Sequence, residues 1–408
     1  MKLSRMTAML GIYAAAFLAW QILGAVTTSR TSTQELRLGK DVQDLWGGEL
    51  AQSDPDLRFH WTTHHEVVVD QHTDVVADEH ENQVSPDSTE IAADVALDQR
   101  LKGLVWYSLY GVTFDGRWTF AYRGDVKDGY LRVFLKLPDP SAMYDDFRFE
   151  VDGVDRTRDL LTDGAERGVN VPVKPGQSVA LHVHYRTRGM GTFSYAPEHA
   201  ATLAHFHMRL DTDFADIDYP QNATSPTRKE RHGLGWQLDW SFAQVLSGKP
   251  MGVVMPSHIQ PGELAAALSF SAPISLLMFF VVLLALATLR KLDIHPINYL
   301  AIACAFFAFQ LLFAYSVDHL PLGWAFALSS GASIGLVTSY LRLVVDARFA
   351  LRESAAAQLV YQVGFALAHL WEGYTGLTVS ILATLTLFLV MQMTGRLKWS
   401  QLLAARPA

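Results

Sequence analysis

Six strongly apolar stretches constrain the fold of this chain more than any other feature of its sequence. They cover residues 9–26, 264–289, 297–317, 323–345, 355–370 and 374–393. A helix of about 20 apolar residues can cross the roughly 30 Å hydrocarbon core of a bilayer and satisfy its own backbone hydrogen bonds. The sequence therefore predicts a polytopic α-helical membrane protein, in which 355–370 is the shortest of six spans.

The basic residues near these stretches fall on alternate ends of them. They are Lys2 and Arg5, then Arg290 and Lys291, then Arg348 and Arg352, and finally Arg396, Lys398 and Arg406. The opposite short loops, 318–322 and 371–373, contain no Lys or Arg. Because cytoplasmic loops carry the excess of Lys and Arg, we expect both termini in the cytoplasm and residues 31–263 outside it.

The first apolar stretch has a second interpretation. Its positive flank and the small residues around Ala25 are also typical of a cleaved signal peptide. Cleavage would leave the placement of the large domain unchanged and would remove only its N-terminal tether.

The charge distribution indicates three parts: an N-terminal membrane anchor (1–30), a β-rich domain (31–263) and a C-terminal bundle of five spans (264–408). Residues 31–263 hold 36 of the 41 acidic and 22 of the 33 basic residues, a formal charge of −14 against +6 for the rest. So acidic a module is a poor candidate for binding nucleic acid, and we expect no such partner.

A single cysteine, Cys304, lies within the third apolar stretch, so the large domain has no disulfide. An oxidising compartment permits disulfides without requiring them, and a domain of this size can bury an adequate core. The sequence is thus typical of a bacterial inner-membrane protein with its large domain in the periplasm.

Runs in which apolar and polar residues alternate, and runs of aromatic or β-branched residues, recur between Leu104 and Trp240 with turn residues between them. This pattern predicts an extracytoplasmic all-β domain, and an antiparallel β-sandwich is the natural arrangement. The polar stretch 31–50 is expected to continue the first span as a helix. Residues 64–86, rich in histidine and acidic residues, are expected to form a loop.

Histidines offer weak candidates for metal binding. His182 and His184, like His205 and His207, are spaced so that both imidazoles of a pair share one face of a strand. If the two strands paired, four imidazoles could meet in a zinc-like site. The alternative is a polar, solvent-facing side of the sheet, and the histidines of the 64–86 loop have an equally ordinary interpretation as a solvated segment.

Ionisable groups at the membrane surface form the main functional candidate. Asp318 and His319 lie in one predicted outer turn, and His369 and Glu372 lie in the other. Groups of this kind near a bilayer are functional candidates because their burial is costly, although two polar turns can also occur without a shared role.

Several enzyme signatures are missing from the sequence. There is no His-Glu-x-x-His motif and no phosphate-binding glycine loop, and Ser329-Ser330-Gly331 is preceded by Leu328 rather than by the glycine of a rhomboid protease. Ala327, Gly331 and Gly335 form a small-residue face that permits close helix packing. We therefore expect neither an enzyme nor a cofactor.

Four motifs together resemble the CreD family of bacterial inner-membrane proteins. They are Val42-Gln43-Asp44-Leu45-Trp46-Gly47 followed by Gln52 and Pro55, Arg100-Leu101-Lys102-Gly103-Leu104, His295-Pro296-Ile297-Asn298-Tyr299-Leu300, and Arg396-Leu397-Lys398-Trp399. The resemblance covers the whole layout and is most specific from Leu289 to Trp399. Residues 60–80 depart from it, because histidines stand where an apolar run is expected.

The resemblance implies a non-enzymatic role in cell-envelope integrity and the stress response, with no catalytic residue to carry over. The periplasmic domain would contact an envelope protein or glycan, and the bundle would contact the lipid bilayer. The alternative is a transporter or intramembrane enzyme that uses the outer-face cluster of Asp318, His319, His369 and Glu372. The oligomeric state is left open by the sequence.

Overall fold

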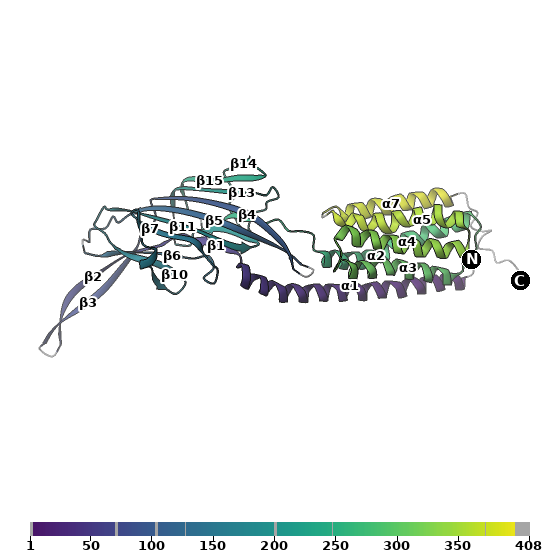
Figure 1. The fold of residues 1–408 in the computed structure, drawn as a ribbon, viewed down its shortest axis with the longest axis horizontal. Helices are drawn as coiled ribbons and strands as arrows, with labels where there is room; N and C mark the ends of the chain where they lie inside the picture. The colour runs from purple at the N-terminus through teal and green to yellow at the C-terminus, as the bar shows by residue number, and fades with distance from the viewer. Residues whose placement is uncertain are drawn as a thin grey trace. The chain divides into compact units, whose positions relative to one another are not determined.

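The computed structural model describes residues 3–69, 72–102, 105–126, 128–199, 202–246, 248–371 and 373–395, without the side chains of 3–6, 67–69 and 72–74. The chain divides into two compact units (Figure 1). The helical unit comprises Met1–Leu38, Lys102–Val105 and Ile259–Ala408, and the β unit comprises Gly39–Leu101 and Trp106–His258.

Long apolar helices build the helical unit. They are α1 (Leu3–Trp46), α2 (Pro261–Leu289), α3 (Pro296–Ser316), α4 (Leu322–Val344) and α7 (Thr375–Thr394). Each of the five is long and apolar enough to cross a membrane. Helices therefore occupy the first four predicted spans and the sixth, and α1 continues through the stretch 31–46 as predicted.

The fifth predicted span is helical but irregular. Its elements are a π-helix (Phe349–Ser354), α5 (Ala355–Gln358), a second π-helix (Leu359–Gly364), α6 (Phe365–Leu367) and a 3₁₀ turn (Ala368–Leu370). We call the whole run 349–370 the composite segment. Its α, π and 3₁₀ turns follow one another without a break, so it is not one of the five regular helices.

Small residues let α1 approach α2 closely. A Cβ added at Gly24 would lie 2.7 Å from the ring of Phe270, and one at Gly262 would lie 2.2 Å from the Thr31 hydroxyl. The Tyr13 hydroxyl donates to the Pro273 carbonyl at 3.1 Å. The small residues Gly331 and Gly335 of α4, in contrast, have open space beside them, so the close packing expected there does not occur within the described chain.

Among the described residues, sixteen strands make up the β unit, with one short 3₁₀ helix, Thr157–Asp159, between β8 and β9. Their bounds are β1 Leu50–Ser53, β2 Asp56–Val69, β3 His72–Gln83, β4 Ser88–Lys102, β5 Val105–Ala121, β6 Tyr130–Lys136, β7 Asp145–Val151, β8 Val154–Asp155, β9 Leu161–Asp163, β10 Glu166–Pro172, β11 Ser178–Met190, β12 Thr192–Ala196, β13 Leu203–Thr212, β14 Arg228–His232, β15 Gly235–Val245 and β16 Met251–Val254. The β-rich character that the sequence predicts is confirmed.

The described strands form three sheets. The largest has the order β14-β15-β13-β4-β5-β11-β7-β8, the second has β3-β2-β6-β10-β9, and the third has β1-β12-β16. One hydrophobic core joins them, because Leu50, Phe59, Trp118, Leu131 and Phe193 are all buried in the same cluster. Strand alternation places one side of the largest sheet in this core and leaves the other side polar, whereas β1, β12 and β16 are buried along most of their length.

The histidine-rich stretch 64–86 is not the predicted loop. From Asp56 to Val69 and from His72 to Gln83 the chain forms an antiparallel ribbon, β2 with β3. Only the base of β2, Asp56–His60, also pairs with β6. Cross-strand polar pairs such as His65 with Asp78 at 2.7 Å let a ribbon of low hydrophobicity form.

Candidate functional site

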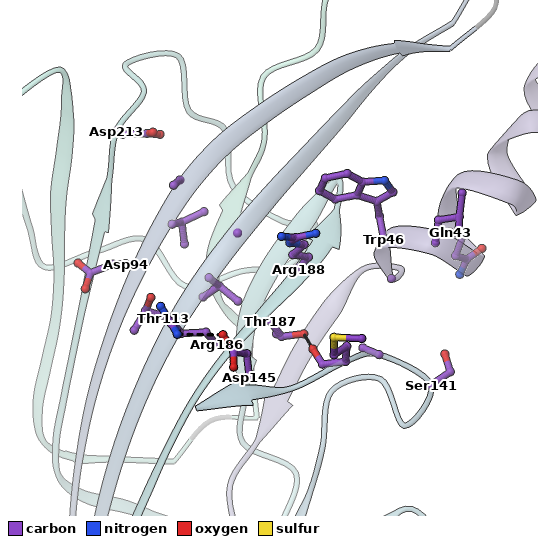
Figure 2. A pocket seen from close by; sticks show the side chains of 18 of the residues that line it. Gln43, Trp46, Asp94, Thr113, Ser141, Asp145, Arg186, Thr187, Arg188 and Asp213 are labelled. Carbon is purple, nitrogen blue, oxygen red and sulfur yellow. Dashed lines mark hydrogen bonds and ion pairs between the residues drawn. The ribbon is translucent and has the colours of Figure 1, made fainter. Parts of the chain in front are cut away.

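A pocket of about 800 Å³ opens on the β unit where the end of α1 meets the polar face of the largest sheet (Figure 2). Its walls come from five neighbouring strands, β13, β4, β5, β11 and β7, from residues 141–143 before β7, and from the α1 terminus. The residues that line it are 43–47, 94–96, 111–113, 141–143, 145, 186–188 and 211–213.

Strand alternation explains why these residues face outward. On β4, Asp94 is exposed while Val95 is buried, and on β11 Arg186 is exposed while Thr187 is buried. The ladder sets Arg186 opposite Thr113 and Arg188 opposite Gly111. Because Gly111 has no side chain and nothing lies within 4 Å of the position of its missing Cβ, it leaves a hollow in this row.

The tryptophan–glycine stretch after the first span forms the upper wall. Gly47 takes a φ of +91°, and a Cβ there would lie 2.7 Å from the Arg188 carbonyl oxygen, so the chain needs glycine to turn from α1 into β1. This turn holds the half-buried Trp46 over the sheet. The guanidinium carbons of Arg100 and Arg188 lie 4.2 and 4.9 Å from its ring centroid, and Figure 2 shows Arg188 beside the indole.

Charges of both signs line the pocket. Its carboxylates are Asp44, Asp94, Asp145, Asp211 and Asp213, and its cations are Arg186 and Arg188. Arg186 donates to Asp145 at 2.9 Å, a pair drawn in Figure 2. A polar lining with one aromatic edge can hydrogen-bond a hydroxyl- or amide-rich ligand. Its described residues include no histidine or cysteine that would serve as a base or nucleophile.

A second hollow of about 530 Å³ lies on the β2-β6-β10 sheet and is lined by ion pairs. Arg132 lies 2.7 Å from Asp163 and 3.2 Å from Glu166. At its edge Asp54, only 1% exposed, accepts from the backbone N–H groups of Glu198 and His199 at 2.6 and 2.9 Å. The charges here are already paired with one another, so the side chains of this hollow neutralise each other's charge.

The Asp54–His199 pair is the most buried ion pair of that region. Burial raises the pKa of Asp54, but the hydrogen bonds from His199 and from the two backbone N–H groups outweigh it and hold the pKa below its usual value. The hydrogen bond to Asp54 raises the pKa of the His199 ring, against the opposing effect of its partial burial. Each group therefore stabilises the charged form of the other.

The outer-face candidates do not assemble as a His/acid cluster among the described residues. Asp318 pairs with Arg30 of α1, whose Nη2 lies 2.9 Å from both carboxylate oxygens. His319 is exposed, and the His369 ring nitrogen lies 3.1 Å from the Phe365 carbonyl of its own segment. Glu372 lies outside the described residues.

Arg30 is the residue that sequence reasoning missed. It donates to the Ala314 carbonyl at 3.1 Å, and its guanidinium carbon lies 4.9 Å from the Tyr315 ring centroid. Burial raises the pKa of Asp318, and the charge of Arg30 opposes that shift. The signal available in the sequence was a cation just beyond the end of the first apolar stretch, next to the membrane surface.

The two histidine pairs lie apart. His182 and His184 are on β11, His205 and His207 are on β13, and strands β4 and β5 separate them. No group of three or more metal-ligating side chains with suitable geometry occurs in the part of the chain that the structure describes.

Acidic neighbours hold the histidines instead. His182 lies 2.8 Å from Asp115 and 3.2 Å from Glu150. His205 has a positive φ of 45° and contacts the Asp87 carbonyl at 3.1 Å. These contacts agree with the alternative that the sequence left open, a polar, solvent-facing side of the sheet.

In comparisons with known proteins, one part of the chain matches a family model. Curated proteins give no match. Among solved structures, the chain is similar to a Legionella pneumophila protein described as a "putative nutrient binding protein", with 10% identity, a TM-score of 0.32, and coverage of 60% of this chain and 96% of that one. A TM-score so low carries no argument. Residues 264–400 match the family model of CreD, inner membrane protein CreD, and this match confirms the resemblance to the CreD family inferred from the motifs.

Proposed function

We propose that the protein maintains the integrity of the cell envelope as a non-enzymatic, multi-pass inner-membrane protein. In this proposal residues 31–263 lie in the periplasm, both termini lie in the cytoplasm, and the helical bundle anchors the β unit. The CreD match over residues 264–400 supports the membrane assignment. The five apolar helices and the alternation of basic residues support the topology.

The observation that carries the proposal is the pocket between the α1 end and the sheet face. Its 800 Å³ could hold a short segment of a polymer, and its carboxylates, guanidinium groups and backbone edges suit a ligand rich in hydroxyl or amide groups. A glycan or a peptide segment of an envelope protein has that chemistry. The lining offers many hydrogen-bonding groups beside one aromatic edge, and this supports binding as the proposed role.

Filling the pocket tests the proposal. Gly111→Gln places a side chain in the hollow beside Arg188 without a clash at Cβ. Thr119→Gln is the matched control, because Thr119 lies on the same strand outside the pocket lining. Both variants would be expressed at matched membrane levels in a deletion strain under detergent and cell-wall-antibiotic stress.

We expect Thr119→Gln to restore survival and Gly111→Gln to fail, while both keep the unfolding temperature of the wild type. Equal rescue by the two variants would remove the pocket from the function. Equal failure with native stability would show that the whole sheet face, rather than the pocket, is used.

A further inference from the structure

A band of neutral polar side chains runs through the interior of the helical bundle. We call it the polar seam and define it as Gln310 of α3, Ser330 and Ser333 of α4, and Ser354, Gln358 and Gln362 of the composite segment. Every one of these side chains is at least nine-tenths buried. None carries a charge, and none belongs to the pocket or to the outer-face candidates.

Hydrogen bonds at the centre of the seam join three helical elements. The Ser333 hydroxyl lies 2.8 Å from the Ala305 carbonyl of α3 and 2.9 Å from the Gln362 amide oxygen. Gln358 donates its amide N–H groups to Gln362 at 2.7 Å and to Ser333 at 3.1 Å. Polar contacts of this kind hold membrane helices together, so the central part of the seam has a packing role.

Packing does not explain the rest of the seam. Within the described part of the chain, the side-chain oxygens of four members have no hydrogen-bond partner: Gln310 Oε1, Ser330 Oγ, Ser354 Oγ and Gln358 Oε1. The residues are 4%, 8%, 0% and 0% exposed, respectively. An oxygen buried in a bundle surrounded by lipid has no bulk water to bond, so each of the four requires a partner inside the protein.

The backbone of the composite segment is unusual at the same place. Ser354 ends one π-helix, and Gln362 lies within the second, with Gln358 on the short α turn between them. π-Helical turns are rare and occur often at functional sites. In this segment they accompany a repeat of polar residues every four positions, which puts three polar side chains on one side of it.

One end of the seam reaches a charged pair. Glu353 precedes Ser354 and forms an ion pair with Arg290 through one carboxylate oxygen, while its other oxygen, Oε2, is buried and has no partner in the described chain. The Glu353 side chain is 24% exposed, so this end is open to the surroundings. Toward the other end, Phe309, Phe313 and Phe326 pack their rings together and close the bundle with apolar surface.

We infer that α3, α4 and the composite segment enclose a hydrated site for water and water-sized hydrogen-bonding solutes, entered from the Arg290–Glu353 end. Internal water bonds buried polar groups that the protein itself leaves unpaired. The ligand is of this size because the oxygens without partners are neutral and spread over several turns, which does not match one compact ion. This inference concerns the bundle and is independent of the proposed periplasmic function.

Thiol accessibility in the full-length protein tests the inference. Cys304 is the only cysteine, so Cys304→Ala gives a thiol-free background. Ser354→Cys and Ser333→Cys then report on the entrance and the centre of the seam. Leu336→Cys is the matched control: it lies on α4 one turn from Ser333, and Leu336 is 50% exposed on the outside of the bundle, where lipid would cover it. The probe is the silver ion, applied to protein in nanodiscs.

A thiol reacts as its thiolate, which forms where water reaches it. We expect Ser354→Cys and Ser333→Cys to lose their free thiols at least about tenfold faster than Leu336→Cys. Reaction of all three at the slow rate of the control would overturn the inference.

Discussion

The β unit and the helical unit distribute polar side chains in opposite ways. In the β unit the core is apolar, and charges such as Arg186 and Asp145 lie on the exposed sheet face. In the helical unit large apolar side chains such as Leu385 and Phe388 of α7 are exposed, 58% and 61%, whereas Gln358 and Gln362 are buried. The medium around each unit explains the difference, since water favours polar surfaces and lipid favours apolar ones.

The two units also differ in how they hold charge. The β unit buries three described carboxylates, Asp54, Asp56 and Asp239, and supplies the most buried of them, Asp54, with backbone N–H groups and an imidazole. The helical unit keeps its ion pairs near the helix ends, as in Arg30 with Asp318 and Arg290 with Glu353. A charge inside a domain surrounded by water can be compensated by dedicated partners, whereas a charge in a membrane bundle is cheaper at the interface.

The largest expected effect is at Asp54, the most buried of the described carboxylates in the β unit. Asp54→Ala leaves the backbone N–H groups of Glu198 and His199 without an acceptor and should lower the free energy of unfolding by about 3 kcal/mol. Asp163→Ala is the control, because that carboxylate is 64% exposed in its pair with Arg132 and should cost less than about 1 kcal/mol. Chemical denaturation measures both, and similar losses would contradict the distinction drawn here between buried and exposed pairs.

Helix contact in the bundle should be the next most sensitive feature. Gly262→Leu forces a side chain against Thr31 and should destabilise the α1–α2 contact by about 2 kcal/mol. Gly331→Leu on α4 has open space and should leave stability unchanged. Thermal unfolding in one detergent compares the two, and an equal fall in melting temperature would argue against close α1–α2 packing.

A smaller effect is expected for the ion pair at the end of the bundle. Arg30→Ala removes the partner of Asp318 from a pair whose side chains are 28% and 20% exposed, and it should cost about 1 kcal/mol. A double-mutant cycle with Asp318→Asn isolates the coupling of the pair. The exposed pair of Arg123 and Asp87 gives the comparison, and a coupling no larger than for that pair would mean that Arg30 contributes nothing specific.

The smallest effect should be the pH dependence that His199 gives to the β unit. Its raised pKa stabilises the fold fully below 6.5, and this contribution is lost as the pH rises through the folded-state pKa. The lowered pKa of Asp54 acts oppositely: its contribution is present above 3.8 and is lost as the pH falls through the folded-state value. His199→Gln should therefore cost more stability at about pH 5 than at about pH 9. A cost that does not change with pH would show that His199 acts without its charge.

Much of the helical unit follows from hydrophobic runs, because 18 to 26 mostly apolar residues leave few alternatives to a helix. The composite segment was harder to predict. Residues 355–370 were predicted as one short span. The π turns depend on how Ser354, Gln358 and Gln362 contact α3 and α4, and no local sequence pattern predicts such contacts. A helical continuation of the first span was predicted over the polar stretch 31–50, and α1 ends within that stretch, at Trp46.

The β unit shows the limit of local reasoning more clearly. Alternation predicted the strands, yet the ribbon of β2 with β3 was read as a loop because its residues are charged and rich in histidine. Strand order keeps the two histidine pairs apart, since β4 and β5 lie between β11 and β13. The pocket was also beyond prediction, because Trp46, Asp94, Arg188 and Asp211 are far apart in sequence and meet only through sheet topology.

One complementation experiment sets the pocket against the outer-face candidates. One variant carries Gly111→Gln, and the other carries His319→Ala, His369→Ala and Glu372→Ala together, both at matched membrane levels in the deletion strain under envelope stress. An envelope protein that works through its periplasmic pocket predicts failure of the first variant and rescue by the second. Rescue by the pocket variant with failure of the triple variant would contradict it and would place the function in the membrane bundle.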